Sequence, residues 1–184
     1  MSYGSSLRSR YLKTTRSILF MVPALAIVFV FGPAPADSPS DPKRVAFEII
    51  DRNADQIANV SDVLYYFAEP GMQEHESSKY VKETLERAGF AVELGGAGMP
   101  TNVWAKWGSG KPVIAIATEM DALPEGSQTP GSIPRKPLVE GAPGHMEGHN
   151  VMGAVGVGAA FAVKKTMEQF KIPGTIVLSI SPAE

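Results

Sequence analysis

The chain has 184 residues, of which 44% are hydrophobic and 20% are charged, and its formal net charge at pH 7 is -2. A charge this close to neutral leaves no basic surplus for binding a polyanion, so nucleic acid is excluded as an expected partner. The chain contains no cysteine, which excludes disulfides and thiol nucleophiles and leaves only nitrogen and oxygen ligands for any metal site.

The first 36 residues have the order of a secretory signal peptide. Basic residues precede an apolar run over residues 18–31, and Ala34-Pro35-Ala36 follows as a small-residue cleavage site. We therefore expect cleavage after Ala36, export to the periplasm or the extracellular space, and contact with a membrane only during export. An uncleaved membrane anchor is the alternative, but the apolar run is shorter than the roughly 20 residues that span a bilayer.

Residues 37–43 are rich in Pro, Ser and Asp and are expected to be a linker, and residues 44–184 are expected to form one domain. Apolar residues recur every three or four positions over residues 44–67, which predicts one amphipathic helix. The same spacing over residues 77–88 predicts a second helix, which Gly89 ends.

Short apolar segments predict strands at residues 90–94, 102–107 and 113–117. The Gly108-Ser109-Gly110 turn favours an antiparallel hairpin between the second and the third of them. The third is apolar at every position, so we expect both of its faces to be covered inside a helix-flanked sheet. A helix over residues 149–170 and a strand over residues 175–180 follow. The glycines of Gly156-Val157-Gly158 indicate close packing of that helix on the sheet rather than a nucleotide-binding loop.

Two acidic residues, Glu119 and Asp121, directly follow the third predicted strand. Open α/β sheets bind their ligands at the carboxyl ends of the strands, so this position favours a functional role. A solvated strand end with a capping aspartate is the equal alternative. The loop that follows, residues 123–144, is long and rich in Gly and Pro, as functional loops often are.

The segment Gly144-His145-Met146-Glu147-Gly148-His149-Asn150 is dense in metal-ligand side chains. An extended backbone would put His145, Glu147 and His149 on one face, and a helix would pair the two histidines. Carboxylate and imidazole are usual ligands of zinc and manganese. The helical zinc-protease signature is excluded, because Met146 stands where that signature needs glutamate. The alternative is a loop whose histidines only bind nearby backbone, and His145 is not assigned as a ligand.

Several separated motifs, in the same order, resemble amidohydrolases of the zinc aminoacylase and carboxypeptidase family, and most of all its p-aminobenzoyl-glutamate utilisation branch. The motifs are Gly98–Thr101, Trp107–Ile114, Glu119–Pro124, the segment 144–150 and the final Pro182-Ala183-Glu184. The resemblance covers Val45 to Glu184. It implies an α/β fold, the helix-flanked mixed sheet of a zinc-peptidase-like (phosphorylase/hydrolase-like) catalytic domain. It also implies hydrolysis of the amide bond in N-acyl or aminobenzoyl amino acid conjugates by a metal-bound water, with two divalent ions, zinc or manganese.

The resemblance also implies residue roles. Glu184 matches the glutamate that takes a proton from the attacking water and passes it to the leaving amine. Asp121 matches the aspartate that orients the metal centre. Glu147 and His149 match metal ligands, and Glu119 is a further candidate ligand, at a place where other branches have histidine. The resembled branch usually has cysteine in place of Glu147, whereas other branches use a carboxylate there.

The chain stops at Glu184, before the family's next glutamate ligand and before its lid or dimerisation domain. We therefore expect the amino-terminal part of a hydrolase, with weak metal binding and little or no turnover by itself. The full-length parent is expected to act on small N-acyl amino acids or peptide-like substrates. A homodimer is one of the assemblies that the parent can form. The alternative is a non-catalytic relic or binding module derived from such a hydrolase.

Overall fold

The computed structural model describes residues 41–184, so the predicted signal peptide over residues 1–36 lies outside the described residues. The elements are α1 (Pro42–Arg52), α2 (Ala54–Phe67), α3 (His75–Arg87), β1 (Ala91–Leu94), η1 (Gly96–Gly98), β2 (Val103–Ser109), β3 (Val113–Glu119), α4 (His149–Phe170) and β4 (Gly174–Ser181). Helix α1 begins at Pro42, two residues before the predicted start of the domain at residue 44. None of the helices over residues 41–184 combines the length and the apolar composition that a membrane-spanning helix needs.

The single helix predicted over residues 44–67 is wrong in one respect, because Asn53 divides it into α1 and α2. The Asn53 side chain donates a hydrogen bond to the Ile49 carbonyl at 2.6 Å, and its backbone leaves the helical region at φ -107° and ψ 14°. Asparagine competes in this way for backbone groups, so it ends helices that hydrophobic spacing alone would continue.

The four strands form one mixed sheet in the order β1-β2-β4-β3. Strand β2 pairs antiparallel with both β1 and β4, whereas β3 pairs parallel with β4. The predicted hairpin between β2 and β3 is therefore wrong, because β4 lies between them. Gly108 and Ser109 extend β2 opposite Thr175 and Gly174 instead of forming the turn. Helix α4 provides the long crossover that a parallel pair requires.

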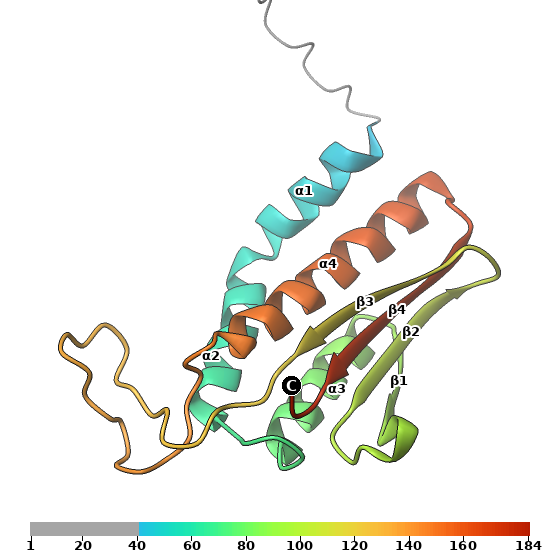
Figure 1. Cartoon of the computed structure of the whole chain (residues 1–184). Helices are drawn as coiled ribbons and strands as arrows, with labels where there is room; N and C mark the ends of the chain where they lie inside the picture. The colour runs from blue at the N-terminus through green and yellow to red at the C-terminus, as the bar shows by residue number, and fades with distance from the viewer. Residues whose placement is uncertain (1–40) are drawn as a thin grey trace, which may run out of the picture. The chain divides into compact units, whose positions relative to one another are not determined.

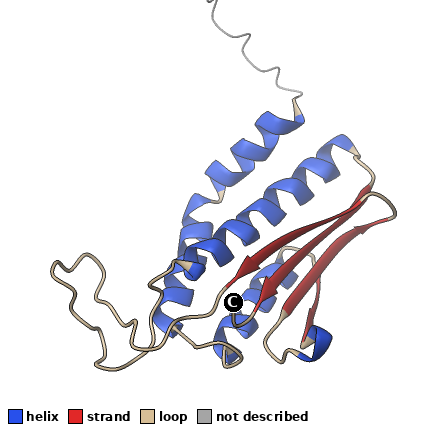
Figure 2. Ribbon diagram, viewed as in Figure 1, coloured by secondary structure: helices blue, strands red, loops and turns tan. Residues whose placement is uncertain are grey.

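The helices pack on one face of the sheet, as Figures 1 and 2 show. Helices α2, α3 and α4 share one core with alternate residues of β2 and β4; its largest members include Leu64, Leu85, Phe161, Leu178 and Ile180. The expectation that both faces of residues 113–117 are covered is wrong for the described part of the chain. Strand β3 is an edge strand, and Val113 and Ile114 are each 60% exposed. An all-apolar segment therefore identified the strand but not its place in the sheet.

Candidate metal centre

Three segments of the chain meet at the carboxyl ends of β3 and β4. These strands are parallel, with Glu119 opposite Ser181, so the residues that follow each strand emerge at the same edge of the sheet. Helix α4 begins there, with His149 as its first residue. The topology thus brings together side chains from positions 119–121, 147–149 and 184.

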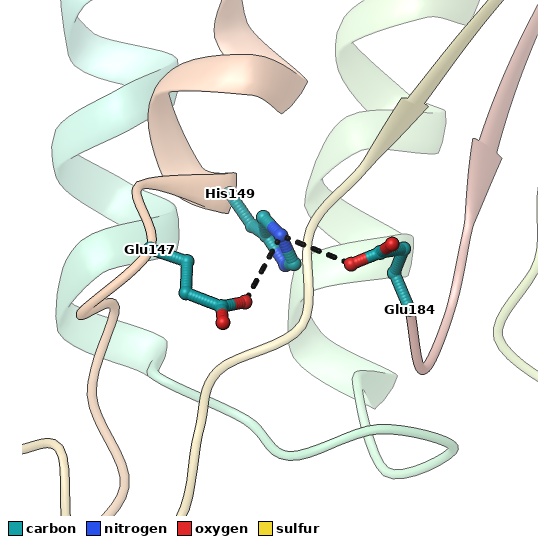
Figure 3. Close-up of side chains that lie close together, drawn as sticks. All are labelled: Glu147, His149 and Glu184. Carbon is teal, nitrogen blue, oxygen red and sulfur yellow. Dashed lines mark ion pairs between the residues drawn. The ribbon is translucent and has the colours of Figure 1, made fainter.

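Glu147, His149 and Glu184 form a compact group in which one ligand atom of each lies within 4.8 Å of the others. His149 Nε2 is 3.4 Å from Glu147 Oε2 and 3.7 Å from Glu184 Oε2, and the two carboxylates approach the imidazole from different directions (Figure 3). The His149 side chain is 7% exposed, whereas those of Glu147 and Glu184 are 52% and 61% exposed. The group therefore has a buried nitrogen anchor and an open side that solvent reaches.

Asp121 fixes the orientation of the His149 ring. Its Oδ1 lies 3.1 Å from His149 Nδ1, and both side chains are buried. A carboxylate accepts, so Nδ1 carries the proton and Nε2 is the atom directed at the two glutamates. An imidazole lone pair that faces two carboxylates is repelled unless a proton or a cation lies between them. The donor set of two carboxylates and one oriented imidazole fits a divalent cation.

Asp121 also contacts the end of the chain, since its Oδ1 accepts a 3.4 Å hydrogen bond from the Glu184 amide. We expect Asp121→Asn to weaken Zn²⁺ binding by about 10-fold, because the neutral amide polarises the His149 ring less than a carboxylate does. Isothermal titration calorimetry measures this affinity. Asp62→Asn, at an exposed position on α2, is the matched control, and an equal loss in both variants would contradict the prediction.

Glu119 is not part of this three-residue group. It ends β3, and its Oε2 is buried without a hydrogen-bond partner among the described residues. An unpartnered buried carboxylate oxygen is unfavourable unless something else satisfies it. The expected role of Glu119 as a ligand therefore stays a prediction.

His145 is directed away from the group and toward helix α2. Its Nε2 donates to the Leu64 carbonyl at 3.0 Å, and its Nδ1 is buried without a partner in the part of the chain that the structure describes. Burial is the main reason that the pKa of His145 lies below its usual value of 6.5, although the bond to Leu64 opposes this. The three alternating residues of the motif thus divide, with Glu147 and His149 in the group and His145 outside it.

Because the pKa of His145 is lowered in the folded chain, we expect the chain to lose stability as the pH falls. Below about pH 6.5 the unfolded chain takes up a proton at His145 that the folded chain resists, so the free energy of unfolding falls as the pH falls through this window. We expect His145→Gln to reduce that fall, measured by urea unfolding in EDTA at about pH 7.5 and about pH 5.5. His75→Gln, at an exposed position, is the control, and parallel curves for the parent chain and His145→Gln would contradict the prediction.

Glu74, to which no sequence pattern assigns a role, lies next to the site in the structure. Its side chain is fully buried, at 0% exposure, and it accepts a hydrogen bond from the Ala183 amide at 3.2 Å. Glu74 directly precedes α3 in a charged stretch that is typical of a solvated helix start. No spacing or motif in the sequence distinguishes it from its exposed neighbours His75 and Glu76.

The chain is similar to several known proteins, although no protein-family model matches it. Over 137 residues the chain is 34% identical to a subunit of the p-aminobenzoyl-glutamate hydrolase of Escherichia coli, a match that covers 74% of this chain and 28% of that protein. Over 132 residues it is 34% identical to thermostable carboxypeptidase 1 of Saccharolobus solfataricus, covering 71% of this chain and 32% of that protein. The chain thus spans about a third or less of these curated relatives.

A solved structure supports the same fold. A dinuclear metal-binding peptidase of the M20 family from Bacillus subtilis superposes with a TM-score of 0.55 at 27% identity, covering 77% of this chain and 36% of that one. The predicted α/β class with a helix-flanked mixed sheet is confirmed by the described structure and by this likeness.

Proposed function

We propose that this chain, which is homologous to metal-dependent amidohydrolases and carboxypeptidases, supplies the amino-terminal, metal-binding part of a hydrolase. The bond that we propose it cleaves is the amide of N-acyl or aminobenzoyl amino acid conjugates. The observation that supports this most directly is the group formed by Glu147, His149 and Glu184, with its ring oriented by Asp121. The relative from Escherichia coli is named for p-aminobenzoyl-glutamate, which makes that conjugate the first substrate to test.

The donor set suits zinc or manganese. Glu147 and Glu184 offer carboxylate oxygens and His149 offers an imidazole nitrogen, and both ions accept this mixture. A divalent ion, when bound, polarises a carbonyl and lowers the pKa of a water molecule. We propose two ions, with Glu119 as a ligand of the second.

The chain's own residues have distinct parts in this proposal. Glu184 is the most exposed of the three side chains, so its carboxylate is open to both water and substrate and can take up a proton and pass it on. Asp121 keeps the Nδ1 proton of His149 in place. Glu147 supplies a second carboxylate oxygen that faces the same imidazole from another direction, as Figure 3 shows.

Metal binding is the first test. Equilibrium dialysis of the 184-residue chain against Zn²⁺ or Mn²⁺ should show saturable binding that Glu147→Gln weakens. Glu140→Gln is the matched control, since Glu140 is an exposed acid that precedes the same segment. An absence of saturable binding, or an equal loss in the control, would argue against the proposed function.

Substrate hydrolysis is the second test. The metal-loaded chain is incubated with p-aminobenzoyl-glutamate and with N-acetyl amino acids, and release of the amine or of the free amino acid is followed. Release that Glu184→Gln abolishes would support amide hydrolysis. Saturable metal binding without release is the result expected of an amino-terminal part with little or no turnover by itself, and it is also the result expected of a binding module derived from such a hydrolase.

The order of residues 1–36 supports a further part of the proposal, which is export with removal of a signal peptide. Expression in a bacterial host followed by fractionation and amino-terminal sequencing tests it. A mature protein that begins at Asp37 is expected outside the cytoplasm. A chain that keeps residues 1–36 and stays with the membrane would support the anchor interpretation instead.

A further inference from the structure

Glu74 is a fully buried carboxylate that forms no ion pair with any described residue. A buried charge without a cationic partner is unfavourable, so its hydrogen bonds must compensate. One carboxylate oxygen accepts from the Thr101 hydroxyl at 2.5 Å, and the other accepts from the Ala183 amide at 3.2 Å. These partners lie 27 and 109 residues away in sequence, so Glu74 joins three separate parts of the chain.

The turn that carries Glu74 also packs directly against the end of the chain. A Cβ atom on Gly71 would lie 2.6 Å from Ala183 Cβ and 2.8 Å from Ala183 Cα, so only glycine fits at this position. Ala183 itself has φ 55°, in the left-handed region that L-residues adopt uncommonly because it brings Cβ close to the backbone. In this conformation Ala183 packs against Gly71 and its amide donates to Glu74.

The position of Glu184 depends on two consecutive backbone amides. The Ala183 amide is held by Glu74 and the Glu184 amide by Asp121, at 3.2 Å and 3.4 Å. Asp121 also holds His149 at 3.1 Å. Two buried acidic residues therefore place the terminal segment against the imidazole, one through Ala183 and the other through Glu184.

We propose that Glu74 is a positioning residue, which holds Ser181–Glu184 in the conformation that directs the Glu184 carboxylate at His149. Glu74 itself does not contact the group formed by Glu147, His149 and Glu184; it acts through the Ala183 amide. The proposal about position stands on the geometry alone. Its consequence for metal binding rests on the proposed function.

Nuclear magnetic resonance of the metal-free chain tests the position. Glu74→Leu should accelerate amide exchange at Ala183 by about 10-fold or more and remove the nuclear Overhauser contact between the His149 ring and the Glu184 side chain. Glu74→Gln keeps an acceptor for Ala183 and should preserve both signals. Thr101→Val removes only the other hydrogen bond, and it should also preserve them. Retention of both signals in Glu74→Leu would overturn the proposal.

Gly71→Ala provides an independent test that leaves Glu74 unchanged. Its methyl group would displace Ala183, so the contact between His149 and Glu184 should be lost although the carboxylate of Glu74 is still present. If Glu74→Leu unfolds the chain, Gly71→Ala still tests whether this turn sets the position of Glu184, and loss of both signals in Glu74→Gln would contradict the expectation that an acceptor at position 74 is enough to hold Ala183. An unaltered His149–Glu184 contact in Gly71→Ala would show that the turn does not set the position of Glu184.

A double-mutant cycle tests the consequence for metal binding. Glu74→Leu should weaken Zn²⁺ affinity by about 10-fold in the parent chain but by less than about 2-fold in a Glu184→Gln background, because the effect passes through Glu184. A general loss of structure would act equally in both backgrounds, and that result would overturn the proposed route. If the parent chain binds no Zn²⁺, the proposed function fails, and the nuclear magnetic resonance experiments alone decide on the position.

Discussion

Replacing His149 by alanine is expected to lower the affinity of the chain for Zn²⁺ by at least about 100-fold, or about 2.7 kcal/mol. His149 is the only nitrogen donor in the group, and its Nε2 lies between the carboxylates of Glu147 and Glu184. Its removal leaves two exposed carboxylates with no buried anchor between them. Exposed acidic side chains alone hold a divalent ion weakly, because water competes for it.

The same substitution should also destabilise the metal-free chain. Asp121 is 4% exposed, and without the imidazole it loses the donor at 3.1 Å while keeping only the weaker contact with the Glu184 amide. A buried carboxylate that loses its donor costs about 1–3 kcal/mol. Urea unfolding in EDTA measures this cost separately from metal affinity.

His75→Ala is the matched control, because His75 is an exposed histidine at the first position of α3. It should change neither the Zn²⁺ affinity nor the free energy of unfolding by a measurable amount. Equal losses of affinity in the two variants would mean that Zn²⁺ binds histidines nonspecifically. Unchanged affinity in His149→Ala would place the metal site elsewhere in the chain.

Local sequence patterns predicted the elements well, because each pattern reports a property of the segment itself. Helix α4 spans residues 149–170 as predicted, and strands β1, β2, β3 and β4 begin within one residue of their predicted positions. The pairing of these strands was not predictable in the same way. The glycines after Trp107 are typical of a hairpin, but β4 competes for the same edge of β2 and forms seven residue pairs with it.

In the candidate site, too, residues that are close in the sequence were predictable, whereas residues that only the fold brings together were not. Glu147 and His149 are two residues apart, so their density in the sequence predicted that they act together. Glu184 and Asp121 joined them only through the resemblance, since the sheet topology that brings them together is a long-range property. Glu74 was not predictable, because its burial depends on the turn at Gly71 and on Ala183 at the far end of the chain.

The close packing of α4 on the sheet was predicted from its small residues and is confirmed by the position of Gly156. A Cβ atom on Gly156 would lie 2.8 Å from Thr118 Cγ2 and 3.1 Å from Leu178 Cδ1. Thr118 belongs to β3 and Leu178 to β4, so this glycine lets the helix axis approach the two parallel strands. The approach matters for the site, because His149 begins the same helix.

Gly156→Val is therefore expected to lower the free energy of unfolding by about 2–3 kcal/mol, because its branched side chain must displace Thr118 or lift α4 from the sheet. Lifting the helix would also move His149 away from Glu184, so Zn²⁺ affinity should fall together with stability. Thermal unfolding and calorimetric titration measure the two effects.

Met152→Val is the matched control, since it places the same branched residue at an exposed position of α4 and adds only the small intrinsic penalty of valine in a helix, about 0.5 kcal/mol. If Gly156→Val loses no more stability than Met152→Val, the packing argument is contradicted, because valine has a higher helix propensity than glycine and propensity alone would stabilise Gly156→Val. If Gly156→Val loses stability but keeps its Zn²⁺ affinity, then the strand ends tolerate a displaced helix. The position of His149 would in that case depend mainly on Asp121 and not on the packing of α4.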